Sequence, residues 1–269
     1  MEKEVKKDSD QAMSSIKISH EVPLSMLEVS RRFNDYDYAL VHLFEEYRGY
    51  FEFYRDSVDM GRDVLLDNSI FELGEAFEAS KFAHWIMKLR PTRYVVPDVL
   101  GDGIETCRKL DEWFGNYAHV PGKAIGVVQG SSYEELTACY KGVDRACDEI
   151  AICFHYPYYE QTDIGRMVGR QNLIDRWLED GIINKEKNHH LLGCSLPQEF
   201  RHYKNYEWIY SLDTSNPIVH GIKEINYRHG ELEEKAKVKL ADLMEHVPSM
   251  LQSQIISFNI QEFRKSLES

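Results

Sequence analysis

The chain has 269 residues and an ordinary globular composition, with 43% hydrophobic and 29% charged residues. No apolar stretch approaches the ~20 residues that a membrane-spanning helix requires, and residues 1–10 hold no apolar run typical of a secretory signal, so we expect a soluble cytoplasmic protein. The formal net charge of −13 argues against a broad basic face for nucleic acid, so any such contact must be local.

Short apolar runs that end on a polar or small group predict buried parallel strands. In chain order they are residues 37–44, 63–67, 93–98, 124–129, 149–155, 190–195 and 208–213. An eighth strand is not clear, and residues 217–221 are its weak candidate. Most of the intervals can hold a helix, which favours a single-domain (β/α)8 barrel over an open doubly wound sheet. An open sheet usually carries a Gly-rich phosphate loop, and the sequence has none.

The remaining segments follow from charge and helical spacing. Residues 1–18 are expected to be a charged, flexible leader, residues 19–269 the barrel domain, and about 156–188 its longest insertion. Helices are predicted at 76–89, 104–114, 131–146 and 234–247, with another entered through 193–200. Ser131 followed three residues later by Glu134 is typical of a helix N-terminus.

The cysteines and histidines do not predict a metal site. The five cysteines stand alone, and no Cys-x-x-Cys or His-x-x-x-His pair occurs. We therefore expect neither structural zinc nor disulfides, and no cofactor.

The chemistry is expected at the strand ends, which converge on one mouth in a barrel. Asp67, Asp98, Gln129, Gly193 and Asp213 all stand there, so three carboxyl groups and an amide would share a pocket. A carboxyl group crowded by others has a raised pKa, whereas one held by donors stays ionised, and acid/base and nucleophilic roles need that split. Any single Asp has a structural alternative as a helix N-cap. The three together favour an active site.

Several of these residues lie in motifs that resemble those of the tRNA-guanine transglycosylase family. Residues 67–72, Asp-Asn-Ser-Ile-Phe-Glu, resemble the family's Asp-Ser-Gly-Gly-Phe-Gln, and residues 126–130, Gly-Val-Val-Gln-Gly, resemble its Gly-Ile-Val-Gln-Gly. Residues 191–199, Leu-Leu-Gly-Cys-Ser-Leu-Pro-Gln-Glu, resemble its Leu-Met-Gly-Val-Gly-x-Pro-Glu-Asp, and Asp213 falls where the family has its nucleophile. The four motifs occur in the family's order.

The resemblance implies a base-exchange reaction on a covalent glycosyl-enzyme. Asp213 would attack the sugar C1′ and expel guanine, as carboxylates do in retaining glycosidases. Asp67 would protonate the leaving purine and deprotonate the incoming one. Asp98 would accept hydrogen bonds from the purine's Watson–Crick edge, and Gln129 would donate to its O6.

The same motifs imply further contacts with the base. Phe71 and Leu192 match the positions that sandwich it, and such stacking contributes roughly 1–3 kcal/mol per base. Gly130 and Gly193 would line the pocket beside them.

This chain departs from the family in ways that narrow the expected substrate. It lacks the Cys-x-Cys-x-x-Cys…His zinc subdomain of the bacterial tRNA enzymes, and it has Ser69-Ile70 and Cys153-Phe154 where the family has paired glycines. A zinc-free chain of this length resembles the phage-type DNA-guanine transglycosylases. We therefore expect exchange of guanine in DNA for a 7-deazapurine such as preQ0.

Other functions stay open at this point. A tRNA-acting transglycosylase would use the same residues, a glycosidase could use two carboxylates, and a non-catalytic subunit is disfavoured because Asp67 and Asp213 are both present. For nucleic-acid contacts the best candidates are Arg166 and Arg170, four residues apart. A solvated helix face is the alternative interpretation of these two arginines.

Overall fold

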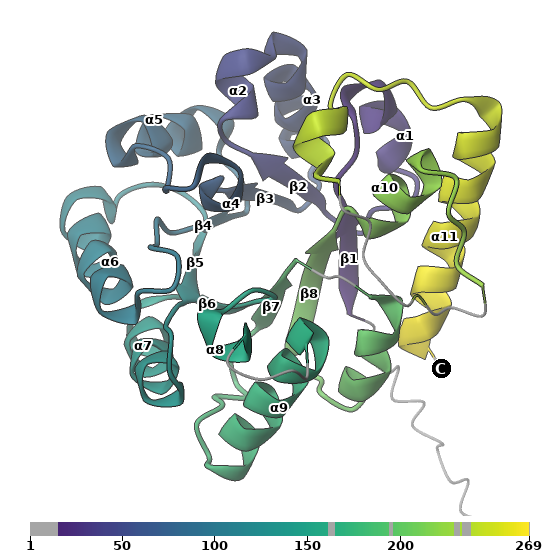
Figure 1. The fold of residues 1–269 in the computed structure, drawn as a ribbon. Coiled ribbons are helices and arrows are strands. Elements are labelled where there is room, and N and C mark those ends of the chain that lie inside the picture. Colours follow the sequence, from purple (N-terminus) through teal and green to yellow (C-terminus); the bar gives the residue numbers. More distant parts are fainter. Residues whose placement is uncertain (1–15, 161–164, 194–195, 229–231, 233–237, 269) are drawn as a thin grey trace, which may run out of the picture.

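The computed structural model describes residues 16–160, 165–193, 196–228, 232 and 238–268. Eight parallel strands form a nearly closed barrel with helices on its outside, which confirms the predicted (β/α)8 class (Figure 1). The strands are β1 Lys17–His20, β2 Asp37–Leu40, β3 Val64–Asp67, β4 Arg93–Val95, β5 Lys123–Val128, β6 Glu149–Cys153, β7 His189–Leu192 and β8 Ile209–Thr214. Their order around the barrel is β1-β8-β7-β6-β5-β4-β3-β2.

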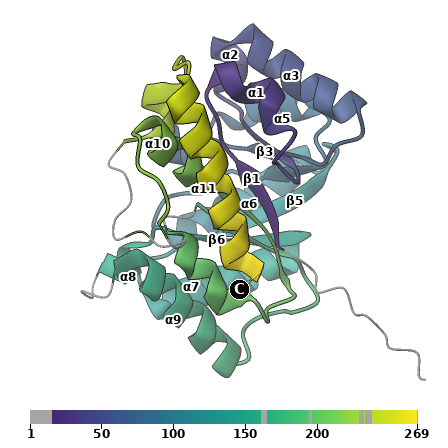
Figure 2. The same ribbon diagram turned by 90° about the vertical axis from the view of Figure 1, so that its right-hand side faces the viewer.

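Helices connect the strands and cover the barrel. The α-helices are α1 Leu27–Ser30, α2 Leu43–Glu46, α3 Arg48–Asp59, α4 Ile70–Leu73, α5 Ala79–Leu89, α6 Gly103–Tyr117, α7 Tyr133–Ala146, α8 Pro157–Glu160, α9 Gly165–Glu179, α10 Asn216–Ile222 and α11 Met250–Glu268. The 3-10 helices are η1 Leu24–Met26, η2 Pro197–Tyr203 and η3 Leu240–Leu243. Figure 2 shows α11 lying along the outside of the barrel beside α10. None of the described helices is both long and apolar enough to cross a membrane.

The strand missing from the sequence prediction is the first one. β1 pairs with β8, with Ser19 opposite Asp213, so the leader predicted through residue 18 was wrong at its end. Residues 1–15 lie outside the described part of the chain. The weak candidate at 217–221 was wrong as well, because these residues belong to α10, where Pro217 stands in the first turn and is well suited to a helix start.

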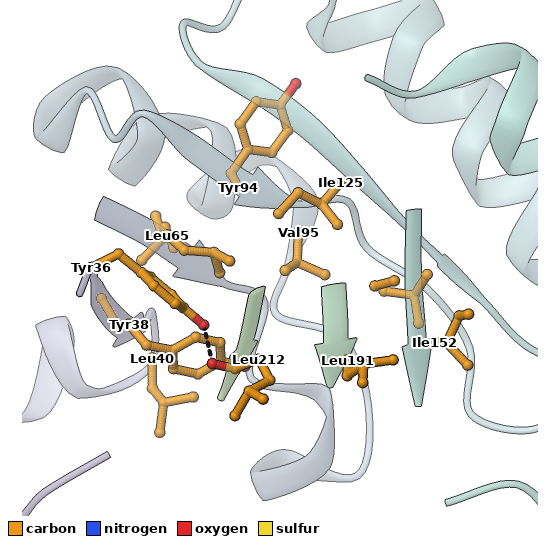
Figure 3. Close-up of a cluster of buried hydrophobic side chains, with 14 of the residues drawn as sticks. Tyr36, Tyr38, Leu40, Leu65, Tyr94, Val95, Ile125, Ile152, Leu191 and Leu212 are labelled. Carbon is orange, nitrogen blue, oxygen red and sulfur yellow. Dashed lines mark hydrogen bonds between the residues drawn. The ribbon is translucent and has the colours of Figure 1, made fainter. Parts of the chain in front are cut away.

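The seam between β1 and β2 is closed by side chains. The Asn34 side chain accepts a hydrogen bond from the His20 N–H and donates to the His20 carbonyl, while Asp35 accepts from the Ile18 N–H. The Tyr36 hydroxyl donates to the Leu212 carbonyl at 2.6 Å (Figure 3). The contacts of Asn34 and Asp35 satisfy backbone groups of β1 on the side where it has no paired strand.

Helix boundaries differ from the prediction where capping decides them. α5 begins at residue 79 rather than 76 because Glu78 caps it, accepting from the N–H groups of Ser80 and Lys81. α6 is capped by Asp102, and α7 by Ser132 rather than Ser131. In each case the capping oxygen takes up an N–H that lacks a helical partner.

The structure also differs from the prediction in three longer segments of the chain. The range 156–188 is not an insertion, because α9 is the ordinary crossover helix between β6 and β7. The helix entered through 193–200 is the 3-10 helix η2. In the described part of 234–247 the only helix is the short η3, and α11 after it was not predicted.

Replacement of Arg90 by Gly should stabilise the fold by about 1 kcal/mol. Arg90 ends α5 in the left-handed region, with φ of 58°, where a side chain costs roughly 1–2 kcal/mol and glycine costs little. Urea unfolding of the variant and the wild type measures the change. Gly181, which has φ of 66° and nothing near its Cβ position, is the matched control, and its replacement by Ala should destabilise by a similar amount. A stability unchanged in both variants would contradict the argument.

Candidate active site at the carboxyl ends of the strands

The predicted polar residues do occupy the carboxyl ends of neighbouring strands. Asp67 ends β3, Asp98 lies in the loop after β4, Gln129 follows β5 directly, and Asp213 lies near the end of β8. All four are buried. Since the carboxyl ends of barrel strands meet at one face, these groups belong to one site.

Asp98 and Gln129 form one half of the site. The Gln129 Nε2 donates to Asp98 Oδ2 at 2.7 Å, and its Oε1 accepts from the Gly101 N–H at 3.0 Å, which fixes the orientation of the amide. Asn68 Nδ2 donates to Asp98 Oδ1 at 2.8 Å. Burial raises the pKa of Asp98, and the two amide donors oppose that rise. Asp98 and Gln129 are each 1% exposed.

Asp213 forms the other half and is held differently. Its Oδ1 lies 3.0 Å from the Gly193 N–H, which donates to it, and 3.1 Å from His190 Nε2. Gly193 can present its N–H there because it has φ of 64°, a conformation that favours glycine. N–H donors are the partners that a carboxylate requires. Both of these contacts are made at Oδ1.

Asp67 has the opposite environment. Burial raises its pKa well above the ordinary value, and the charge of Glu72 raises it further, with a smaller contribution from Asp213. The Ser69 N–H donates to Asp67 Oδ1 at 2.6 Å and lowers the pKa, but by less than burial raises it. Burial therefore shifts Asp67 toward its protonated form, in the same mouth as Asp213.

The mouth also contains polar residues that the sequence did not single out. Glu72 on α4 is half-buried, and burial followed by the Asp213 charge raises its pKa to about 7, against the effect of Lys239. Ser19 is fully buried, pairs with Asp213 in register and so projects from the same side of the sheet. Its hydroxyl has no hydrogen-bond partner within the described chain. Motif position could have suggested Glu72, but Ser19 carried no local signal.

The residues predicted to line the base have mixed surroundings. Phe71 on α4 is 54% exposed, and Lys239 Nζ lies 5.3 Å from its ring centroid. Leu192 ends β7 and is half-buried. Gly130 is required by packing, because a Cβ there would lie 2.9 Å from the Leu136 nitrogen.

Arg170 is not available to a phosphate, so its predicted nucleic-acid role was wrong. Its side chain is fully buried in α9, where Nε and Nη2 donate to both carboxylate oxygens of Glu199 at 2.7 and 3.0 Å. It also donates to the carbonyls of Leu192 and Gly193, and so holds the end of β7. Arg166 is 43% exposed and pairs with Glu160, and its contact with nucleic acid stays a prediction.

No group of three His, Cys, Asp or Glu side chains in the described ranges is arranged to hold a metal ion. The fold and site together define a (β/α)8 barrel with a carboxyl-rich site at its carboxyl-end face. Comparison with protein-family models and with curated proteins finds no match to this chain.

Replacement of Asp67 by Asn should weaken the loss of stability at higher pH. Because the folded-state pKa is raised above 3.8, the folded protein keeps a proton that the unfolded chain loses above pH ~4. The wild type therefore loses stability as the pH rises from there toward the folded pKa, at up to ~1.4 kcal/mol per pH unit, and the variant lacks this loss. Urea unfolding between pH 5 and 7 should show a gap that widens in favour of the variant. A constant gap would mean that Asp67 ionises normally.

The two arginines of α9 should differ sharply in their contribution to stability. Removal of Arg170 leaves the Glu199 charge buried without its partner, so Arg170→Ala should cost roughly 3–5 kcal/mol. Arg166→Ala removes an exposed ion pair and should change the stability by less than about 1 kcal/mol. Chemical unfolding of both variants tests this. Similar losses in the two would show that burial does not set the difference.

Proposed function

We propose that this protein is a guanine transglycosylase, a pentosyltransferase that exchanges a guanine of DNA for a 7-deazaguanine base such as preQ0. The observation that carries the proposal is the contrast between two buried carboxyl groups in one mouth. Asp213 Oδ1 accepts from the Gly193 N–H and contacts His190 Nε2, whereas burial raises the pKa of Asp67. Base exchange requires one carboxyl group that attacks the sugar and a second that gives up a proton, and the two environments support that division of roles.

In the proposed reaction, Asp213 and Asp67 each act twice, once when guanine leaves and once when the incoming base is attached. Asp213 attacks C1′ of the sugar, the C1′–N9 bond breaks, and Asp67 gives its proton to the departing guanine. The incoming 7-deazapurine then loses its N9 proton to Asp67 and attacks C1′, which releases Asp213. The proton returned to Asp67 balances the proton given, so no cofactor is consumed.

Recognition of the purine would use the other half of the site. Asp98 would accept from N–H groups of the Watson–Crick edge. The second Gln129 N–H, on the side of Cys153 Sγ at 3.7 Å, would donate to O6 without a change in the orientation of the amide. The exposed ring of Phe71 offers a stacking face. A guanine of duplex DNA would first leave the stack, at a cost of roughly a few kcal/mol.

One feature of the backbone supports the motif resemblance from which the substrate is proposed. Ser69 stands where the family motif has a glycine, and its φ is 61°, in the left-handed region that glycine occupies without strain. A serine kept in this conformation is consistent with a loop whose shape is needed for the groups around it. DNA is favoured over tRNA because the sequence lacks the zinc-ligand motif of the tRNA enzymes.

Purified protein, preQ0 and either duplex DNA or unmodified tRNA test the reaction and the polymer together. Mass spectrometry of the nucleosides after digestion should detect the deazapurine nucleoside in DNA only. Incorporation into tRNA alone would make this chain an RNA enzyme. Abasic sites formed without any added base would instead indicate a hydrolytic N-glycosylase.

Asp213→Asn should fold normally and lose exchange of labelled guanine by on the order of 10⁴-fold or more, since removing a nucleophile abolishes the covalent route. The wild type, but not this variant, should also give a protein–DNA adduct on a denaturing gel. Asp59→Asn, at the exposed end of α3 that leads into the amino-terminal end of β3, is a control that removes a carboxylate at the opposite face of the barrel. Retained exchange in Asp213→Asn would remove Asp213 as the nucleophile.

A further inference from the structure

A buried chain of polar groups leads from the lower part of the barrel interior to Asp213. The Arg93 guanidinium on β4 donates from Nη1 to Ser211 Oγ on β8 at 3.1 Å. Ser211 Oγ lies 2.8 Å from His190 Nδ1 on β7, and His190 Nε2 lies 3.1 Å from Asp213 Oδ1. All four residues are at most 4% exposed, so water does not supply alternative partners freely.

The direction of these hydrogen bonds follows from Arg93, which can only donate. Its Nε and Nη2 donate to Asp63, and Nη1 uses its two hydrogens on Glu149 and Ser211. Ser211 Oγ is therefore an acceptor toward Arg93. Among the described residues, His190 Nδ1 is the only other group in hydrogen-bond contact with this hydroxyl, so we assign the single Ser211 proton to it.

His190 is then fixed in one tautomer. Its Nδ1 accepts from Ser211, so the ring proton sits on Nε2 and is donated to Asp213 Oδ1. The ring is also held sterically, stacked on Tyr38 at an interplanar angle of 17° and edge-on to Tyr36 at 80°. A neutral ring in this position orients the carboxylate without placing a cation against it.

We propose that His190 is a positioning residue for Asp213, and that Arg93 sets its tautomer through Ser211. With Oδ1 occupied by the His190 and Gly193 N–H groups, Oδ2 is the atom presented for attack. The role of Oδ2 in the attack rests on the proposed function. The tautomer of His190 and its cause do not depend on any reaction.

Nitrogen NMR of protein labelled at its histidine ring nitrogens tests the tautomer directly. His190, assigned by the signal missing from His190→Gln, should show a neutral ring protonated at Nε2 at pH 7. Asp213→Ala separates the two possible causes. If Arg93 acts through Ser211, the Nε2–H form persists without Asp213. A ring protonated at Nδ1 or at both nitrogens in that variant would overturn the proposal.

Kinetics test the positioning role. His190→Phe keeps the ring and its stacking but has no donor, and it should form the covalent adduct about 10–100-fold more slowly with unchanged DNA affinity. His190→Gln places an amide N–H where Nε2 was and should recover most of that rate. Equal rates for the two variants would contradict the role.

His189→Phe is the matched control. His189 is the neighbouring residue of β7 and equally buried, but its Nε2 contacts Tyr140 Oη at 2.8 Å on α7, outside the barrel. Its replacement should leave adduct formation unchanged in the folded protein, and a loss equal to that of His190→Phe would overturn the proposal. If the wild type itself forms no adduct, the proposed function fails, and the NMR result still decides the tautomer.

Discussion

The burial of one cation inside the barrel constrains much of this structure. Arg93 is 3% exposed, and a buried charge is tolerated only when it is paired and hydrogen-bonded. Asp63, Glu149 and Ser211 meet that requirement from the loop before β3, from β6 and from β8. Each contact helps to fix the segment that provides it. Through Ser211, Arg93 is also connected to His190 and to Asp213 at the mouth of the barrel.

The mouth shows how one residue type acquires different properties on one scaffold. Asp98 is braced by two side-chain amides, Asp213 is held at one oxygen by N–H groups, and Asp67 has mainly its burial and neighbouring negative charge. Desolvation disfavours the charged form of a carboxyl group, and donors favour it. The balance of these two effects gives the three carboxyl groups different surroundings without any difference in side-chain chemistry.

The arginines of α9 illustrate the same dependence on surroundings. Arg166 and Arg170 are four residues apart and share a helix face, but that face runs from solvent at one end to a contact with η2 at the other. The buried member joins α9 to Glu199 and to the carbonyls at the end of β7. It therefore supports the loop that carries Gly193, and in an acidic chain this leaves fewer cations to meet a polyanion.

The sequence by itself determined the barrel class, seven of the eight strands and the gathering of Asp67, Asp98, Gln129 and Asp213. Buried parallel strands leave a local signal, a continuous apolar run, and their shared direction brings their ends together. β1 left no such signal, since it has four residues of which Lys17, Ser19 and His20 are polar. Only its pairing with β8, from the opposite end of the chain, makes it a strand. Two partners of the carboxyl groups, Asn68 and His190, and the burial of Arg170 were likewise decided by tertiary structure. Hydrogen-bond partners depend on the register of strands and helices far apart in sequence.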